Sequence, residues 1–259
     1  FRIGACGVHH GPVHDTSKTL SVMQQEHITC IVGIPTQVLK LARCSYGLPL
    51  AMRNVLLTTD YVPDAIRDAV EKAWECRVYN HYGMTETGLG GGVDCEAQQG
   101  YHLREADLYF EIIDPATGTP LPDGETGEVV FTTLNRAGMP LIRYRTGDLA
   151  RMLPGECDCG TMLRRMEHVR GRLNHRIELS NGAILTLPDL DEALFALEGL
   201  LNYKPTVVRG TETCSLQLQV SAVPGAYARV KSESRSALHY SPALRQAFLD
   251  GSLVIQGVE

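Results

Sequence analysis

The sequence has no run of lysine or arginine: its 24 basic and 30 acidic residues are interspersed and give a formal net charge of −6. Nucleic acids and anionic membranes require a basic patch, so neither is expected as a partner. The sequence also lacks a stretch of roughly 18 to 20 apolar residues, the length that a membrane span needs. It opens with no secretory signal pattern. We therefore expect a cytoplasmic protein that works on small molecules.

No internal repeat or low-complexity tract interrupts the 259 residues, and 44% of them are hydrophobic, which is enough for a packed core. The chain begins at Phe1 rather than at a methionine, so we expect it to be part of a longer protein. Its eight cysteines suit a cytosolic protein if they are free thiols or metal ligands, because disulfides are rare in the cytosol.

Short apolar runs alternate with helical periodicity in the first part of the chain, which is typical of βαβ units. Strands are predicted at 29–34, 54–59 and 77–82. Pro35 and Pro63 each follow one of these strands at a position suited to a first helical turn. Right-handed crossovers would make the three strands parallel.

From about Leu103 the pattern changes to β structure. Strands at 107–113 and 128–133 flank a stretch rich in proline, glycine and aspartate, which predicts an antiparallel hairpin with a long connection. A further strand is predicted at 141–144. After Gly171 and Arg172 the pattern is that of a small α+β region, with a hairpin at 181–182, a helix at 188–197 and strands at 206–208 and 216–220.

The predicted fold is therefore α/β, with a domain boundary at about Leu173. Residues 1–172 are expected to form part of a large domain, with a parallel βαβ region at 1–92 and a β-rich region at 93–172. Residues 173–259 are expected to form a small, mobile and incomplete α+β domain.

Polar side chains lie in two loops at the carboxyl ends of the predicted parallel strands, where doubly wound sheets bind ligands. One loop holds Thr59 and Asp60, and the other runs from Asn80 to Glu86. Together they offer an aromatic face for a base, an amide for its edge, a hydroxyl for a phosphate and a carboxylate for a divalent cation. On these residues alone, an ordinary transition from strand to loop is the alternative.

The rest of the sequence favours the nucleotide site. Residues 80–86, N-H-Y-G-M-T-E, resemble the core motif of the adenylate-forming superfamily, which includes acyl-CoA synthetases, the adenylation domains of peptide synthetases and firefly luciferase. Residues 124–128 resemble its Gly-Glu strand motif, 144–148 its Tyr-any-Thr-Gly-Asp motif, and 171–172 the start of its interdomain hinge motif. The stretch 134–148 is most similar to phenylacetate-CoA ligases and to synthetases that adenylate a deazaflavin coenzyme.

The resemblance implies a large N-terminal AMP-binding domain followed by a small C-terminal domain that swings about a hinge near Asn174. It implies a ligase that activates a carboxylic acid with ATP and passes the acyl group to coenzyme A, using Mg²⁺. A homodimer is one option for its assembly. Catalytic roles fall to Thr85, near the α-phosphate, and to Glu86, which would hold the Mg²⁺. The implied nucleotide-binding residues are Thr59, Asp60, Asn80, His81, Tyr82, Gly83, Met84, Thr85, Asp148 and Arg172, with Tyr82 stacked on adenine, Asn80 at its edge and Asp148 on the ribose.

Three departures from the family pattern limit this expectation. Thr58, Thr59 and Asp60 stand where the family usually has Gly-Gly-Glu. No phosphate loop with its lysine precedes the core motif, and no lysine follows Lys231, although the family places a catalytic lysine near its end. We expect the chain as written to bind AMP without completing the reaction. The alternatives are a synthetase that transfers AMP to a cofactor and a non-catalytic, zinc-stabilised nucleotide-binding module.

Two pairs of potential metal ligands adjoin the motifs. Cys95 and His102 follow the core motif, and Cys157 and Cys159 follow Asp148. Three thiolates and one imidazole are a ligand set that structural zinc sites use, although the spacing is not that of two Cys-x-x-Cys knuckles. Because both motifs must meet at one nucleotide, we expect the two pairs to meet as well. Unrelated thiols and a surface histidine are the alternative.

Overall fold

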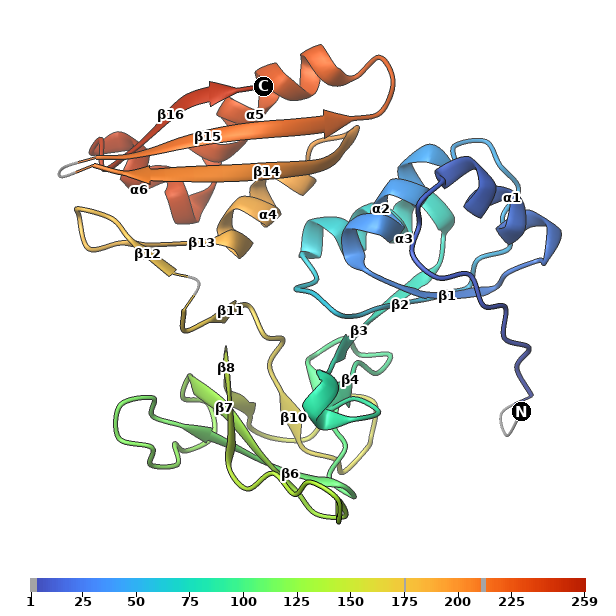
Figure 1. Ribbon diagram of the computed structural model, residues 1–259, viewed down its shortest axis with the longest axis vertical. Coiled ribbons are helices and arrows are strands. Elements are labelled where there is room, and N and C mark those ends of the chain that lie inside the picture. Colours follow the sequence, from blue (N-terminus) through green and yellow to red (C-terminus); the bar gives the residue numbers. More distant parts are fainter. Residues whose placement is uncertain (1–3, 175, 211–212) are drawn as a thin grey trace.

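The computed structural model describes residues 4–174, 176–210 and 213–259, and Figure 1 shows its elements in three groups. The first group holds three parallel strands, β1 (Cys30–Gly33), β2 (Asn54–Leu57) and β3 (Arg77–Tyr82). Helices α1 (Thr16–Gln25), α2 (Pro35–Cys44) and α3 (Asp64–Trp74) accompany them. The three predicted strands and their parallel order are confirmed. Pro35 is the first residue of α2, and Pro63 immediately precedes α3.

The two faces of these parallel strands differ. Val55 and Leu57 of β2 and Val78 of β3 are buried in the same hydrophobic cluster as the apolar sides of α2 and α3. On the opposite face Cys30 is exposed and the Val32 side chain is 62% exposed. Since parallel sheets are usually covered on both faces, this open face is unusual.

Beyond β3 the sheet continues with short antiparallel strands. β4 (Gly92–Val93) and β5 (Tyr101–Leu103) come first, followed by β10 (Arg165–Met166) and β9 (Met152–Leu153), to complete a sheet of seven described strands. Strands of two or three residues are too short to show a hydrophobic periodicity, and they were not predicted.

A second sheet has the order β11-β8-β7-β6. It holds β6 (Leu108–Ile113), β7 (Gly127–Thr133), β8 (Tyr144–Ala150) and β11 (Gly171–Arg172), and the predicted β6–β7 hairpin is confirmed. The predicted strand at 141–144 is wrong, because β8 only begins at Tyr144. Arg143 has a φ of 47°, and this left-handed backbone interrupts an extended strand just before Tyr144.

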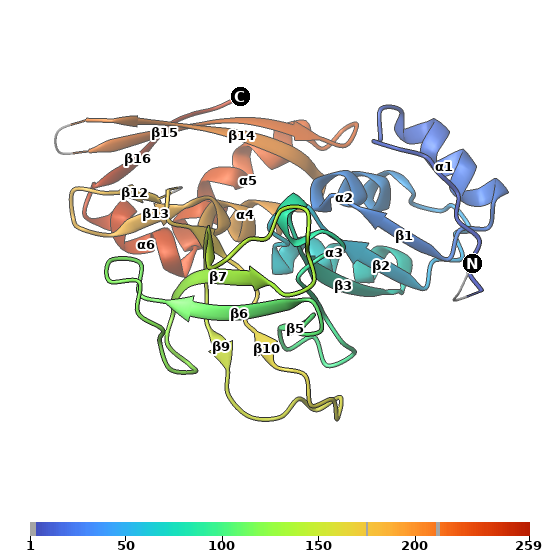
Figure 2. The same ribbon diagram turned by 60° about the horizontal axis from the view of Figure 1, so that its bottom comes forward.

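The last group follows β11. A hairpin of β12 (Arg176–Glu178) and β13 (Ile184–Thr186) leads into α4 (Leu187–Phe195), as the sequence predicted. β14 (Leu200–Arg209), β15 (Cys214–Ala222) and β16 (Leu253–Val258) then form a three-stranded sheet, shown in orange and red in Figures 1 and 2. Two further helices, α5 (Tyr227–Tyr240) and α6 (Pro242–Leu249), precede β16.

Two hydrophobic clusters form the core. The larger one joins α2 and α3 to the elements after residue 178, for example Val38 and Val70 with Leu194 and Leu216. It therefore extends across the predicted boundary at Leu173, which stays a prediction. The smaller one fills the β-rich region around Phe131. None of the helices in the described residues combines the length and the apolar composition that a membrane span needs.

Candidate functional site: a pocket at the ends of the parallel strands and a cysteine–histidine cluster

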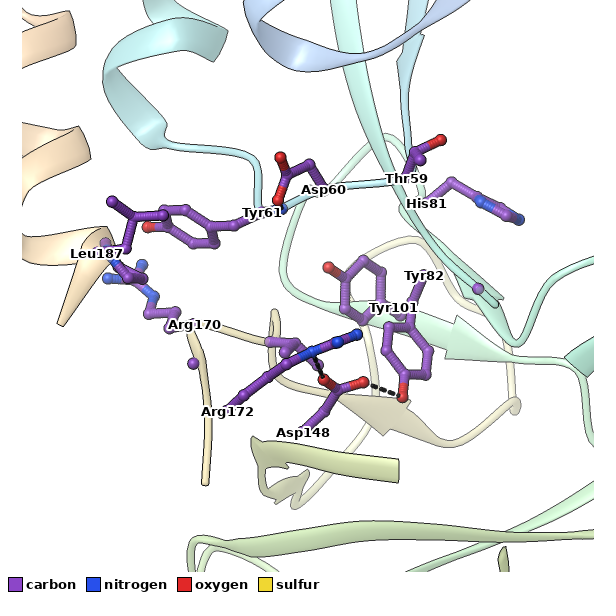
Figure 3. Close-up of a pocket in the computed structure, with 14 residues that line it drawn as sticks. Thr59, Asp60, Tyr61, His81, Tyr82, Tyr101, Asp148, Arg170, Arg172 and Leu187 are labelled. Carbon is purple, nitrogen blue, oxygen red and sulfur yellow. Dashed lines mark hydrogen bonds and ion pairs between the residues drawn. The ribbon is translucent and has the colours of Figure 1, made fainter. Parts of the chain in front are cut away.

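A pocket of about 240 Å³ opens where β3, β8, β11 and the start of α4 meet (Figure 3). Its position at the carboxyl ends of β2 and β3 is where ligands bind in parallel sheets. Seven of the residues implied by the sequence line it: Thr59, Asp60, His81, Tyr82, Gly83, Asp148 and Arg172. Residues from motifs up to 113 positions apart, from Thr59 to Arg172, are thus brought together.

Asp148 lies next to both Tyr82 and Arg172 and interacts with each of them (Figure 3). It is 2% exposed. The Tyr82 hydroxyl donates a hydrogen bond to Asp148 Oδ2 at 2.9 Å, and Arg172 Nε donates to Oδ1 at 2.6 Å. Two donors therefore orient the carboxylate, and β11 supplies one of them because it pairs with β8 at this position.

Two tyrosines form the aromatic wall of the pocket. The rings of Tyr82 and Tyr101 are 5.6 Å apart and tilted by 32°. Burial raises the pKa of the Tyr82 hydroxyl, and the Asp148 carboxylate raises it further. Both phenols therefore stay protonated at neutral pH, since burial likewise raises the pKa of Tyr101.

The loop after β2 forms the opposite side. Thr59 has a φ of 82°, a left-handed backbone that β-branched residues rarely adopt and that glycine adopts freely. Two residues later, the Tyr61 hydroxyl donates a hydrogen bond to the Glu192 carboxylate of α4 at 2.6 Å. The pocket wall is thus tied to the last group of elements, whose Leu187 and Pro188 also line the pocket.

Four implied residues do not line the pocket. Asn80 is buried behind it, Met84 and Thr85 lie further along the loop, and Thr85 is exposed. Glu86 is half-buried and accepts a hydrogen bond from the Tyr144 hydroxyl at 3.3 Å through Oε1. Their implied roles at the adenine edge, the α-phosphate and a metal ion remain predictions.

His81 fixes the loop that follows β3. Its Nδ1 lies 2.8 Å from the Thr58 hydroxyl, and burial lowers the pKa of its imidazole. A side chain at Gly90 would collide with the His81 ring. Gly90 therefore allows the glycine-rich loop to lie directly on this ring.

Six lining residues were not foreseen: Tyr61, Tyr101, Val169, Arg170, Leu187 and Pro188. Tyr101 lies in β5, a strand of three residues, and Val169 lies in the loop between β10 and β11, and neither segment has a sequence pattern of its own. Arg170 stands two residues before Arg172, close enough to the hinge motif to have been considered.

The cysteine–histidine cluster is assembled as predicted. The ligand atoms of Cys95, His102, Cys157 and Cys159 all lie within 4.8 Å of one another. Cys95 Sγ is 3.6 Å from Cys157 Sγ, and Cys159 Sγ is 3.4 Å from His102 Nε2. The cluster could therefore hold a metal ion.

The surroundings of the cluster favour metal binding. His102 Nδ1 lies 3.3 Å from the Leu163 carbonyl oxygen, which can accept an N–H from it, and Nε2 faces the thiols; metal-bound histidines commonly have this arrangement. Burial would raise the pKa of the Cys157 thiol, but hydrogen bonds from the Cys159 backbone and from neighbouring side chains lower it to about 7. A thiolate is therefore available near neutral pH.

Comparison with known sequences gives a consistent result. The family described as AMP-binding enzyme matches residues 1–137. The chain is 34% identical over 178 residues to phenylacetate-coenzyme A ligase from Thermus thermophilus, a match that covers 66% of this chain and 40% of the relative. It is 36% identical over 159 residues to the Escherichia coli enzyme, covering 60% and 36%. These matches span about two fifths of the relatives' length.

Solved structures share the fold. One of them is a crystal structure of 2-hydroxyisobutyryl-CoA ligase in the postadenylation state, bound to an acyl-AMP. The match covers 96% of this chain and 55% of the ligase chain, with a TM-score of 0.79 and 20% sequence identity. The same ligase in the thioesterification state, with CoA, matches 98% of this chain with a TM-score of 0.59. At this identity the likeness shows the fold, which confirms the predicted α/β class.

Proposed function

Because the chain belongs to the AMP-binding, or adenylate-forming, enzyme family, we propose that it is part of an acid–thiol ligase of the phenylacetate-CoA ligase type. The protein that contains it would activate a carboxylic acid as an acyl-adenylate and transfer the acyl group to coenzyme A. An aromatic acid such as phenylacetate is the proposed substrate, and the cytoplasm is the proposed location.

The geometry around Asp148 is the observation that carries this proposal. A carboxylate has about four lone-pair positions, and Tyr82 and Arg172 occupy one on each oxygen. Each oxygen can therefore accept one more hydrogen bond, which suits the two hydroxyls of a ribose. The aromatic wall of Tyr82 and Tyr101 beside it suits a base, so an adenosine fits the pocket.

The proposed reaction has two steps. In the first, a carboxylate oxygen of the acid bonds to the α-phosphorus of ATP, and the bond from that phosphorus to pyrophosphate breaks. In the second, the thiol of coenzyme A loses its proton and bonds to the acyl carbon, and AMP leaves. Glu86 is the proposed Mg²⁺ ligand: Tyr144 bonds only its Oε1, which leaves Oε2 for a cation.

We propose further that residues 173–259 act as the small mobile domain, with its hinge near Asn174. The chain matches the postadenylation state of the solved ligase at a TM-score of 0.79 and its thioesterification state at 0.59. Contacts made by α4 with Tyr61 and α3 would then belong to the first state and break in the second.

Two measurements test the proposal. Calorimetric titration of this chain with AMP should give one site. The protein that carries the chain should show pyrophosphate exchange that depends on an acid, and form a CoA thioester from it. If no acid in a broad panel supported exchange while AMP binding stayed intact, the non-catalytic module would be favoured instead. AMP release without any need for coenzyme A would favour transfer of AMP to a cofactor.

We also propose that the cysteine–histidine cluster holds a structural zinc ion. Zinc bonds of about 2.3 Å to sulfur and 2.0 Å to nitrogen place tetrahedral ligand atoms about 3.4 to 3.8 Å apart. Two of the pairs here are 3.6 and 3.4 Å apart, and all four ligand atoms lie within 4.8 Å of one another. Elemental analysis should find one zinc per chain. Cys157→Ser should lower this content and the thermal stability, whereas Cys214→Ser, a buried thiol outside the cluster, should keep the zinc.

A further inference from the structure

Three buried or half-buried side chains, Asp94, Tyr101 and His168, separate the cysteine–histidine cluster from the nucleotide pocket. Two of them are sequence neighbours of cluster ligands: Asp94 precedes Cys95, and Tyr101 precedes His102. Tyr101 and His102 are consecutive in β5, and successive side chains of a strand point to opposite faces. Tyr101 therefore lines the pocket while His102 points into the cluster.

The Asp94 carboxylate connects two parts of the pocket. Its side chain is 3% exposed. Oδ2 accepts a hydrogen bond from the backbone N–H of Asn80 at 2.8 Å, and Oδ1 lies 2.6 Å from His168 Nε2. Asn80 is followed by His81 and Tyr82, and His168 by Val169 and Arg170, all in the pocket wall. A shift of Asp94 would therefore displace both.

Tyr101 completes this layer. Its ring lies edge-on to the His168 imidazole at 4.8 Å and also packs against Tyr82. Hydrogen bonds from the Val169 backbone and the Asn80 side chain partly offset the rise that burial causes in its pKa. One imidazole thus contacts both the carboxylate next to Cys95 and the aromatic ring next to His102.

We propose that metal occupancy of the cluster and nucleotide binding in the pocket are thermodynamically linked through Asp94, Tyr101 and His168. The inference rests on the zinc site and the AMP site proposed above. A bound ion fixes Cys95 and His102, and with them the backbone that positions Asp94 and Tyr101. Without it the four ligands are free to separate, and part of the binding energy of AMP is spent on reordering the wall.

The linkage predicts a change in AMP affinity. Between the zinc-loaded chain and the chain stripped with a chelator, the dissociation constant for AMP should rise by about 5- to 150-fold, the usual range for coupled sites. Linkage is reciprocal, so saturating AMP should tighten zinc binding by the same factor, as measured by competition with a chromogenic chelator. This second measurement uses the zinc-loaded, folded chain, so it still tests the linkage if the stripped chain unfolds.

Variants of His168 test the path. His168→Ala should keep one equivalent of zinc and bring the coupling factor towards one. His168→Gln places an amide N–H near the position of Nε2 and should restore much of the coupling. Glu167→Gln is the control, because it breaks the neighbouring ion pair to Arg151, 3.1 Å long, without contact to Asp94.

The outcomes separate the three ideas. No zinc in the purified chain would overturn the metal site, and no AMP binding by the loaded chain would overturn the nucleotide site; either result also ends the inference. If zinc and AMP both bind and neither changes the other's affinity, the linkage alone is wrong. Equal coupling in the His168→Ala variant and the unmodified chain would overturn the role of this residue.

Discussion

Asp148 combines burial with two charged or polar partners and still has free acceptor positions. Asp148→Asn keeps its shape but replaces one acceptor oxygen by a donor. We expect AMP binding to weaken by about 1.5 to 3 kcal/mol, the range for hydrogen bonds to charged groups. Calorimetry on the folded variant measures this change.

A matched control exists on β7. Glu128 is also a buried carboxylate paired with an arginine, Arg145, but it does not line the pocket. Glu128→Gln should therefore reduce stability without changing AMP affinity. If both variants bound AMP as the unmodified chain does, the ribose would not lie at Asp148.

Asp191 of α4 is expected to make stability depend on pH. Burial raises the pKa of its carboxyl group to about 7, while the hydrogen bond from Tyr203, 2.5 Å long, lowers it. The unfolded value is about 3.9, so between these values the folded chain binds more protons than the unfolded one. Stability from this group is therefore full below about pH 4 and falls until about pH 7.

Asp191→Asn removes this titration. Between pH 4 and 7 the free energy of unfolding of the unmodified chain should fall by up to about 4 kcal/mol more than that of the variant, since one pKa unit corresponds to about 1.4 kcal/mol. Urea unfolding at several pH values measures it. Asp250→Asn is the control: hydrogen bonds from Asn181 and Ser252 lower the pKa of Asp250 to about 2, so its effect belongs to more acidic pH. Parallel profiles for Asp191→Asn and the unmodified chain would refute the assignment.

At the scale of single residues, the sequence identified Tyr82, Asp148 and Arg172 because they stand in recognisable motifs. It missed Tyr101 and Tyr61, which reach the pocket only through tertiary packing. The Asn80 side chain is buried and hydrogen-bonds to Tyr101, so its predicted place at the adenine edge stays a prediction. Motif position predicts which segment lies at a site, but the rotation of each side chain depends on its neighbours.

Between elements, Glu192 of α4 caps a helix that is distant in sequence. Its carboxylate accepts the backbone N–H groups of Asp64 at 2.9 Å and Ala65 at 3.1 Å, in the first turn of α3. Pro63, at the N-cap of α3, offers no side-chain hydrogen bond. The negative charge also suits the positive end of the α3 dipole.

Glu192→Gln should lower the free energy of unfolding by about 1 to 2 kcal/mol, because capping and charge at the helix end are both weakened. The sole tryptophan, Trp74, lies on α3 and reports urea unfolding by its emission. Glu198→Gln removes an exposed carboxylate that pairs with Lys72 at 3.8 Å, and it should change stability by well under about 1 kcal/mol. Equal effects of the two variants would argue against the cap.

Elements with a strong internal pattern were predicted well. β3 and the β6–β7 hairpin have alternating or continuous apolar residues, and the α4 helix follows a capping box at Thr186. β4, β9 and β10 have two residues each, and β10 also pairs with β5, more than 60 positions earlier in the sequence. Such short strands form because the tertiary fold brings their partners alongside, so a local sequence pattern cannot predict them.

For the whole molecule, the two hydrophobic clusters predict a divided response to metal removal. The cysteine–histidine cluster joins segments that flank β4, β5, β9 and β10, in the region of the smaller hydrophobic cluster. Stripping the metal should raise amide hydrogen exchange in these strands. The urea midpoint read from Trp74, in the larger cluster, should change little. A uniform rise in exchange that includes α2 and α3 would show that the clusters unfold together.

The open face of the parallel strands affects the solubility of the chain. Cys30 and Val32 are exposed there, and Leu56 and Tyr79 are only partly covered by the residues that the structure describes. An apolar surface of this kind favours association between copies in concentrated solution. Val32→Lys should suppress concentration-dependent self-association in sedimentation experiments and leave AMP binding intact. Val208→Lys, at an exposed position on β14, should leave self-association unchanged. A colloidal property of the chain would then depend on the same sheet whose strands β2 and β3 end at the candidate pocket.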